Sequence, residues 1–268
     1  MNLMRILYVS TELVPYTPEN TLSQAALDLP KLMNKKGNDV RIFMPRFGTI
    51  NERRHQLHEV IRLSGMNMII NDIDQPLIIK VASLPNARMQ VYFIDNEDYF
   101  NRKAIYADKK GKFFEDNDER SIFFAKGILE TVKKLNWKPD VIHAQGWMSA
   151  LVPLYLRKYY ADDAFFDDVK MVYSVFDNPF EGVLSENMFD KVKFDGFEDK
   201  DIEHISTANF HNLLKIGIDN ADVVVQGDEV LPVEIMDYIK ENNINFKEHQ
   251  PNENLDEVYK ELVGDKED

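Results

Sequence analysis

Two groups of side chains have the types and positions expected of catalytic or ligand-binding residues. Each group also has a structural explanation. His143 follows the apolar residues 141–142 at the carboxyl end of an expected strand, which is where open α/β sheets bind ligands. A histidine there can equally be a hydrogen-bonded structural residue. Asp116 and Asn117 begin a strongly patterned helix, so capping of that helix explains both residues without a substrate. Function therefore stays open at this level.

Common catalytic and metal-binding motifs do not occur in the sequence. His55, His58 and Glu59 lie close together, but the adjacent arginines 53 and 54 are typical of a solvated charged face rather than of a zinc site. The chain has no cysteine, so it has no thiolate ligand and no cysteine nucleophile. Its 11 glycines form neither G-x-G-x-x-G nor a P-loop, and G-x-S-x-G does not occur either. We expect no metal and no cofactor.

The elements that must position these residues alternate between strand and helix patterns. Strands are predicted at residues 6–9, 40–44, 141–143, 170–176 and 222–226, and helices at residues 22–35, 116–135, 147–160, 209–218 and 230–242. This alternation predicts an α/β fold with a doubly wound, mostly parallel sheet. Three more strand patterns, at residues 68–70, 77–84 and 89–94, are close enough for hairpins and predict a β-ribbon insertion.

One large domain is predicted over residues 1–242. From residue 243 to 268 the chain is polar, with a weak helical pattern at Leu255, Val258, Tyr259 and Leu262. We interpret this segment as a C-terminal tail or a docking helix.

The charge of the chain restricts its partners. It contains 46 acidic and 32 basic side chains, for a formal net charge of -14, which repels phosphate backbones and anionic lipid surfaces. We expect neither nucleic acid nor a membrane as partner. The sequence shows no bilayer-spanning apolar run and no leader pattern at its start, and with the absence of cysteine this predicts a cytoplasmic protein.

Several short motifs occur in a specific order along the chain. They are YVSTELVP at 8–15, LDLP at 27–30, MPRFG at 44–48, DNEDYF at 95–100, DNDER at 116–120, PDVIHA at 139–144 and LKIGI at 214–218. In this order they resemble the first, Rossmann-like domain of the ADP-glucose-type glycogen and starch synthases. These are retaining glycosyltransferases of the two-domain GT-B kind. The resemblance covers residues 4–239 and implies the N-terminal GT-B domain.

The resemblance also implies which residues line the remnant of a pocket. The positions that keep a family residue or its place are Glu12, Asp116, Asn117, His143, Trp147 and Gly182.

Three family sites are altered. The family's phosphate-contacting loop, Lys-Thr-Gly-Gly-Leu-x-Asp, reads here as residues 18–24, with changes at Pro18, Glu19, Asn20, Thr21 and Gln24. The cation is lost, and side chains replace the glycines that allow close backbone approach to a phosphate.

The other two changes concern histidines. Met148 stands in place of the histidine that contacts the transferred glucose in the family, and Phe176 stands in place of the histidine in the family's Thr-x-His-Asn-x-x-Tyr-Gln-Gly loop. A methionine makes no strong hydrogen bond.

The resemblance further implies a second domain, whose arginine, lysine and glutamate hold the donor phosphates and which this sequence does not include. We therefore expect a natural short form that is non-catalytic by itself and has a binding or regulatory role, with an α-glucan or a protein as partner. Two alternatives stay open. A partner chain could supply the missing domain and restore glucosyl transfer, or the exposed face of this domain could form a homo-oligomer.

Overall fold

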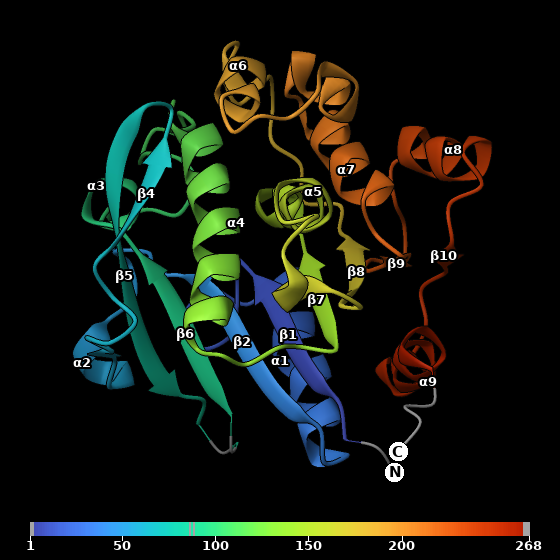
Figure 1. Cartoon of the computed structure of the whole chain (residues 1–268), viewed down its shortest axis with the longest axis horizontal. Helices are drawn as coiled ribbons and strands as arrows, with labels where there is room; N and C mark the ends of the chain where they lie inside the picture. Colours follow the sequence, from blue (N-terminus) through green and yellow to red (C-terminus); the bar gives the residue numbers. More distant parts are fainter. Residues whose placement is uncertain (1–2, 86, 88, 265–268) are drawn as a thin grey trace.

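The computed structural model describes residues 3–85, 87 and 89–264, and its centre is a twisted sheet with helices on both faces (Figure 1). The strand order is β10-β9-β8-β7-β1-β2-β6-β5-β3, and β4 pairs with β5 beside this path. The strands are β1 (Arg5–Ser10), β2 (Asp39–Pro45), β3 (His58–Glu59), β4 (Met66–Ile70), β5 (Ile73–Ser83), β6 (Gln90–Asp95), β7 (Val141–Gln145), β8 (Lys170–Val175), β9 (Val223–Gln226) and β10 (Phe246–Lys247).

The fold class predicted from the sequence is confirmed. Pairing is parallel from β10 through β1 and β2 to β6, and antiparallel among β6, β5, β3 and β4. Every residue of β7 is buried, as expected for a central parallel strand covered on both faces. The predicted ribbon insertion corresponds to β4, β5 and β6, and β6 also joins the parallel part through β2.

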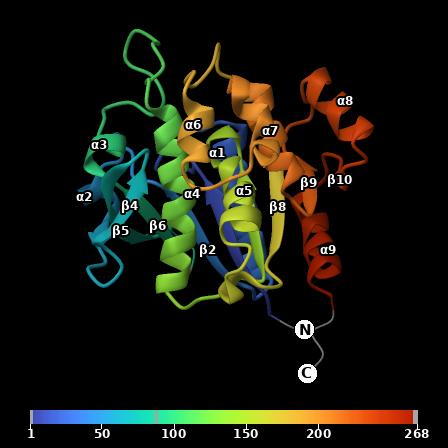
Figure 2. The same ribbon diagram turned by 45° about the horizontal axis from the view of Figure 1, so that its top comes forward.

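Helices cover the sheet in two layers (Figures 1 and 2). The α-helices are α1 (Thr21–Lys35), α2 (Glu52–His55), α3 (Glu97–Phe100), α4 (Asn117–Lys134), α5 (Leu151–Leu154), α6 (Met188–Lys193), α7 (Phe210–Asp219), α8 (Val233–Glu241) and α9 (Asn252–Val263). Helices α4, α5 and α7 lie on the near face in Figure 1, and α1 lies behind the sheet.

Two helices differ from their sequence predictions. Residues 147–160 are helical but change type, from a 3-10 turn at Trp147–Ser149 through α5 to a π-helical turn, η2, at Tyr155–Tyr159. The helix predicted for residues 230–242 begins only at Val233, because Pro232 has an extended backbone with ψ of 136°. The sequence pattern also missed α6, a helix of only six residues. The division of the chain after residue 242 remains a prediction.

The C-terminal helix α9 packs beside α1 and reaches the centre of the sheet. Its Tyr259 is fully buried, and its hydroxyl lies 2.5 Å from Nδ1 of His143 and 3.1 Å from the hydroxyl of Tyr8. Nε2 of His143 lies 2.6 Å from Oγ of Ser174. Both ring nitrogens of His143 therefore have partners inside the protein, and the histidine joins β7 to β8 and to α9.

No helix in the described part of the chain is long and apolar enough to cross a membrane.

Two substitutions that shorten Tyr259 are expected to destabilise the fold, the second more than the first. Tyr259→Phe leaves Nδ1 of His143 buried without this partner and should lower the free energy of unfolding by about 1–3 kcal/mol. Tyr259→Ala adds a cavity and should cost about 3–5 kcal/mol. Urea unfolding measures both losses. Glu257→Ala changes an exposed residue of the same helix and should alter the free energy little. An equally small effect of Tyr259→Phe would contradict this account of α9.

His143 should make the stability depend on pH. Burial lowers the pKa of His143 to about 3, because the interior disfavours the charged imidazolium. Histidine in the unfolded chain has a pKa of about 6.5, so between these values the unfolded state binds a proton that the folded state does not. Stability must then fall as the pH decreases below about 6.5. Between pH 7 and pH 5.5 the wild type should lose about 1 kcal/mol more than His143→Gln in urea unfolding. Equal losses in the two proteins would show that His143 titrates normally.

Candidate functional site at the carboxyl edge of the sheet

The parallel strands β1, β7 and β8 end side by side, and the loops that follow them form the candidate site. Ser10, Gln145 and Ser174 are aligned across the three strands near their carboxyl ends. His143 lies two residues before the end of β7, because the strand continues beyond the predicted residue 143 to Gln145. Its side chain points into the core contacts with Tyr259 and Ser174, so the structure gives His143 a structural role away from the loops.

Glu12 is the centre of a hydrogen-bond network behind the loop between β1 and α1. Its Oε2 accepts a hydrogen bond of 2.5 Å from Nδ2 of Asn20, and its Oε1 lies 3.1 Å from the hydroxyl of Tyr106. That hydroxyl also lies 2.7 Å from Oγ1 of Thr11. Burial, reinforced by the charge of Glu12, raises the pKa of Tyr106 well above its ordinary value, so the hydroxyl remains a donor. Both carboxylate oxygens of Glu12 are therefore engaged within the chain.

Asn20 also caps helix α1. Its Oδ1 accepts from the backbone N–H of Ser23 at 2.8 Å, and its own N–H donates to Oγ of Ser23 at 2.9 Å, which is a reciprocal capping box. The carbonyl of Asn20 accepts from the N–H of Gln24. Backbone donors at a helix start are the usual binding groups for phosphates. Here the amide of Ser23 is already used by the cap, and that of Gln24 forms the first hydrogen bond of the helix itself.

The other altered positions of this loop lie at the surface. Pro18, Glu19, Asn20 and Thr21 are exposed, and Gln24 is half-buried with its Nε2 donating to Oδ2 of Asp28 at 2.8 Å. Residues 18–24 thus present Glu19 as their charged group, and no cation.

Trp147 belongs to an aromatic cluster that covers the start of the helix after β7. Its ring lies 5.0 Å from Tyr106, 5.8 Å from Phe113 and 5.0 Å from Phe180, between ring centroids. Phe113 and Phe180 stack at 5.2 Å. The rings come from three loops that are far apart in sequence, and only 3% of Trp147 is exposed. Packing within the protein explains the tryptophan without a bound ligand.

Asp116 and Asn117 bind arginines. Asp116 occupies the N-cap position of α4, but its side chain makes no cap hydrogen bond, so its predicted capping role was wrong. Its carboxylate instead forms an ion pair with Arg102 and raises the pKa of that arginine. Oδ1 of Asn117 accepts from Nη1 of Arg120 at 2.5 Å, and Nη2 of Arg120 donates to the carbonyl of Ile105. The guanidinium groups of both arginines are thus already bonded within the chain.

Met148 and Phe176 face the core. Met148 is completely buried and Phe176 is 2% exposed. A β-carbon placed on Gly227 would lie 2.5 Å from the ring of Phe176, so this ring packs directly on the backbone after β9. Both apolar replacements serve as core residues at places where a polar side chain would need a buried partner.

Gly182 lies apart from these clusters. It has a φ of 75°, which favours glycine, and it is exposed, with nothing within 4 Å of an added β-carbon.

Two residues that the sequence interpretation missed carry unpaired acceptors. Oε1 of Gln145 and Oδ1 of Asn178 are buried, and neither has a hydrogen-bond partner within the described residues. Nδ2 of Asn178 would lie 3.8 Å from a β-carbon on Gly146, so the amide of Asn178 lies near the glycine that follows Gln145 in the chain. A polar residue at the end of a parallel strand is a general signal for ligand contact, and it could have identified Gln145. Such acceptors suit a hydroxyl or amide donor.

Within the described residues, no group of three His, Asp or Glu side chains is placed to hold a metal ion.

Comparison with known proteins shows to which family the chain is related. The family model described as the starch synthase catalytic domain matches residues 5–244. A glycogen synthase of Chlorobium luteolum is 36% identical over 86% of this chain, and one of Chlorobium limicola is 35% identical over 87%. The chain covers 48% and 47% of these two relatives. It thus spans about half the length of the curated relatives it matches.

A solved structure supports the fold. The catalytic domain of starch synthase IV from Arabidopsis thaliana, bound to ADP and acarbose, matches with a TM-score of 0.73 at 18% identity. The match covers 92% of this chain and 51% of the solved chain. Together with the family match over residues 5–244, these relatives show that the chain belongs to the starch synthase catalytic-domain family.

Proposed function

We propose that this chain is a non-catalytic homologue of the glycogen and starch synthases, which binds an α-glucan and does not itself transfer glucose. The observation that carries the proposal is the capping of α1 by Asn20, whose side chain is also bonded to Glu12. This arrangement uses the backbone donor of Ser23 at the start of the helix, and it places the carboxylate of Glu12 directly behind the cap.

The charges at the edge support the same conclusion. Transfer from a nucleotide sugar requires preorganised positive charge around the departing diphosphate. At this edge Glu12 and Glu19 contribute negative charge, Arg102 is paired with Asp116, and the guanidinium of Arg120 is fully buried. An ADP-glucose diphosphate would therefore lack compensating charge here.

The buried acceptors favour a hydroxyl-bearing ligand. Oε1 of Gln145 and Oδ1 of Asn178 are buried acceptors without partners, and sugar hydroxyls donate to such groups. The relatives are glycogen synthases, and the solved relative is described with acarbose, a sugar-like ligand, bound. An α-glucan is therefore our proposed partner, in preference to a protein.

The purified chain should not transfer glucose from ADP-glucose to glycogen. Incorporation of labelled glucose into glycogen measures this, with the Chlorobium luteolum glycogen synthase as positive control. ADP-glucose should also leave the melting temperature unchanged, because ligands that bind the native state raise it. Labelled glycogen formed by the chain alone would contradict the proposal.

A second candidate is an enzyme assembled from two chains. It is favoured by Val230 and Val233, which are each 74% exposed after β9. Mixing the chain with the separately produced second half of the Chlorobium luteolum synthase tests it, since transfer should appear only in the mixture. Sedimentation at micromolar concentration separates this assembly from a homo-oligomer of the chain. A chain that stays monomeric in both experiments would exclude both assemblies.

A further inference from the structure

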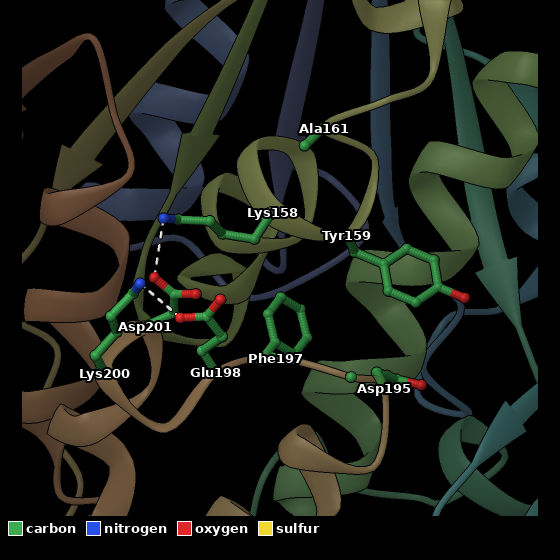
Figure 3. Close-up of a pocket in the computed structure, with 9 residues that line it drawn as sticks. Lys158, Tyr159, Ala161, Asp195, Phe197, Glu198, Lys200 and Asp201 are labelled. Atoms are coloured by element: carbon green, nitrogen blue, oxygen red, sulfur yellow. Dashed lines mark ion pairs between the residues drawn. The ribbon is translucent and has the colours of Figure 1, made fainter.

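A hollow of about 480 Å³ lies on the helical face of the molecule, between the end of the helix that follows β7 and the segment after α6 (Figure 3). One wall is Tyr159, in the turn η2, and the opposite wall belongs to residues 195–201. Tyr159 is twelve residues beyond Trp147 on the same helical run, which at about 1.5 Å per residue places it about 18 Å from the carboxyl edge. The hollow is therefore separate from the candidate site described above.

Two aromatic rings form the apolar part of this hollow. Tyr159 is 43% exposed, whereas Phe197 is 7% exposed, and their ring centroids are 6.4 Å apart. The edge of the Phe197 ring meets fully buried Tyr155 at 5.0 Å. Packing against the core therefore holds the Phe197 ring in place, and Tyr159 offers an accessible aromatic surface.

Paired charges form the polar part. Lys158 and Asp201 are 2.9 Å apart, and Lys200 and Glu198 are 2.5 Å apart; the dashed lines in Figure 3 mark these ion pairs. The third carboxylate of the lining, Asp195, is bound by Lys126 from α4. Every carboxylate of the lining has an ammonium partner, so the hollow carries little net charge and offers both donors and acceptors. Such a lining suits neither a phosphate nor a free amine.

Asp195 holds the surrounding elements in place. Its Oδ1 lies 2.6 Å from Nζ of Lys126, and its Oδ2 accepts from the hydroxyl of Tyr155 at 2.5 Å. Lys126 also donates to the carbonyl of Ile69 at 2.8 Å, and its Nζ lies 5.3 Å from the centroid of the Tyr159 ring. The side chains of Asp195 and Lys126 are each only 7% exposed. Contacts that exist before a ligand arrives reduce the entropy cost of binding it.

We propose that this hollow binds one or two sugar rings of a neutral oligosaccharide, as a holding site distinct from the carboxyl edge. A pyranose has an apolar C–H face that stacks on an aromatic ring and equatorial hydroxyls that both donate and accept hydrogen bonds. Tyr159 supplies the stacking surface, and the paired side chains Lys158, Glu198 and Asp201 supply polar contacts at the rim. The choice of an α-glucan as the oligosaccharide rests on the proposed function. Such a site would keep the chain bound to a glucan polymer, although the chain does not extend the ends of that polymer.

The test is a calorimetric titration of the full chain with maltoheptaose. Tyr159→Ala should weaken binding at least tenfold, and Tyr159→Leu, which keeps apolar bulk but removes the aromatic face, should weaken it similarly. Tyr159→Phe should bind nearly as well as the wild type. Phe194→Ala is the matched control, because Phe194 is 51% exposed one residue before Asp195 but does not line the hollow. Thermal unfolding of each variant verifies that it is folded.

The outcomes separate this inference from the proposed function. Unchanged affinity in folded Tyr159→Ala or Tyr159→Leu would overturn the holding site, as would an equal loss in Phe194→Ala. If Gln145→Leu alone weakens binding, glucan binding at the carboxyl edge stands and the holding site fails. If the wild type shows no heat of binding at millimolar maltoheptaose, the holding site is overturned for this glucan, and glucan binding is removed from the proposed function. The lack of transfer is judged by the incorporation assay alone.

Discussion

Polar groups buried at the carboxyl edge of the sheet need hydrogen-bond partners, and this requirement shapes the first loop, the start of α1 and the loop before α4. An unpaired buried polar group costs about 1–3 kcal/mol, so an edge without a ligand must supply partners from the chain. Glu12 obtains them from Asn20 and Tyr106, and Arg120 obtains them from Asn117 and Ile105. Gln145 and Asn178 keep one unpaired oxygen each. Glu12 and Asn20 therefore have partners within the chain, whereas the buried oxygens of Gln145 and Asn178 do not.

The back of the sheet also needs partners from the chain, here helices that cover its apolar side chains. Central parallel strands must be covered on both faces, and α1 covers only part of the face behind β1 and β7. Helix α9 lies outside the residues matched by the family, yet it contributes the fully buried Tyr259. Its hydroxyl reaches His143 and Tyr8 on adjacent strands. The histidine that the family resemblance placed in the pocket remnant is thereby held inside the fold.

The two proposed binding regions differ in how they are built. The carboxyl edge consists of loops that follow strands, where ligands of α/β folds ordinarily bind. The hollow at Tyr159 lies on the helical face and is assembled from the turn η2 and residues 195–201, which Asp195 joins to Lys126 of α4. Its rigidity comes from buried contacts, whereas its ligand-facing groups remain at the surface. We propose that a chain with both regions holds a glucan without the charges that glucosyl transfer requires.

The sequence alone determined the fold class, the positions of the long helices and central strands, and the membership of the family. These properties depend on local periodicity and on the order of short motifs, which are written within a few residues of each other. It also showed directly that residues 18–24 contain Glu19 and no cation. Short elements such as α6 were missed, because six residues carry too little pattern.

Only the tertiary structure decided what the candidate residues contact. One partner of His143 is Tyr259, 116 positions away, and Asp116 pairs with Arg102 although its sequence position favours a helix cap. The hollow at Tyr159 brings together residues from η2 and the segment after α6. Such contacts depend on how distant elements pack against the sheet. A pattern confined to neighbouring residues contains no record of that packing.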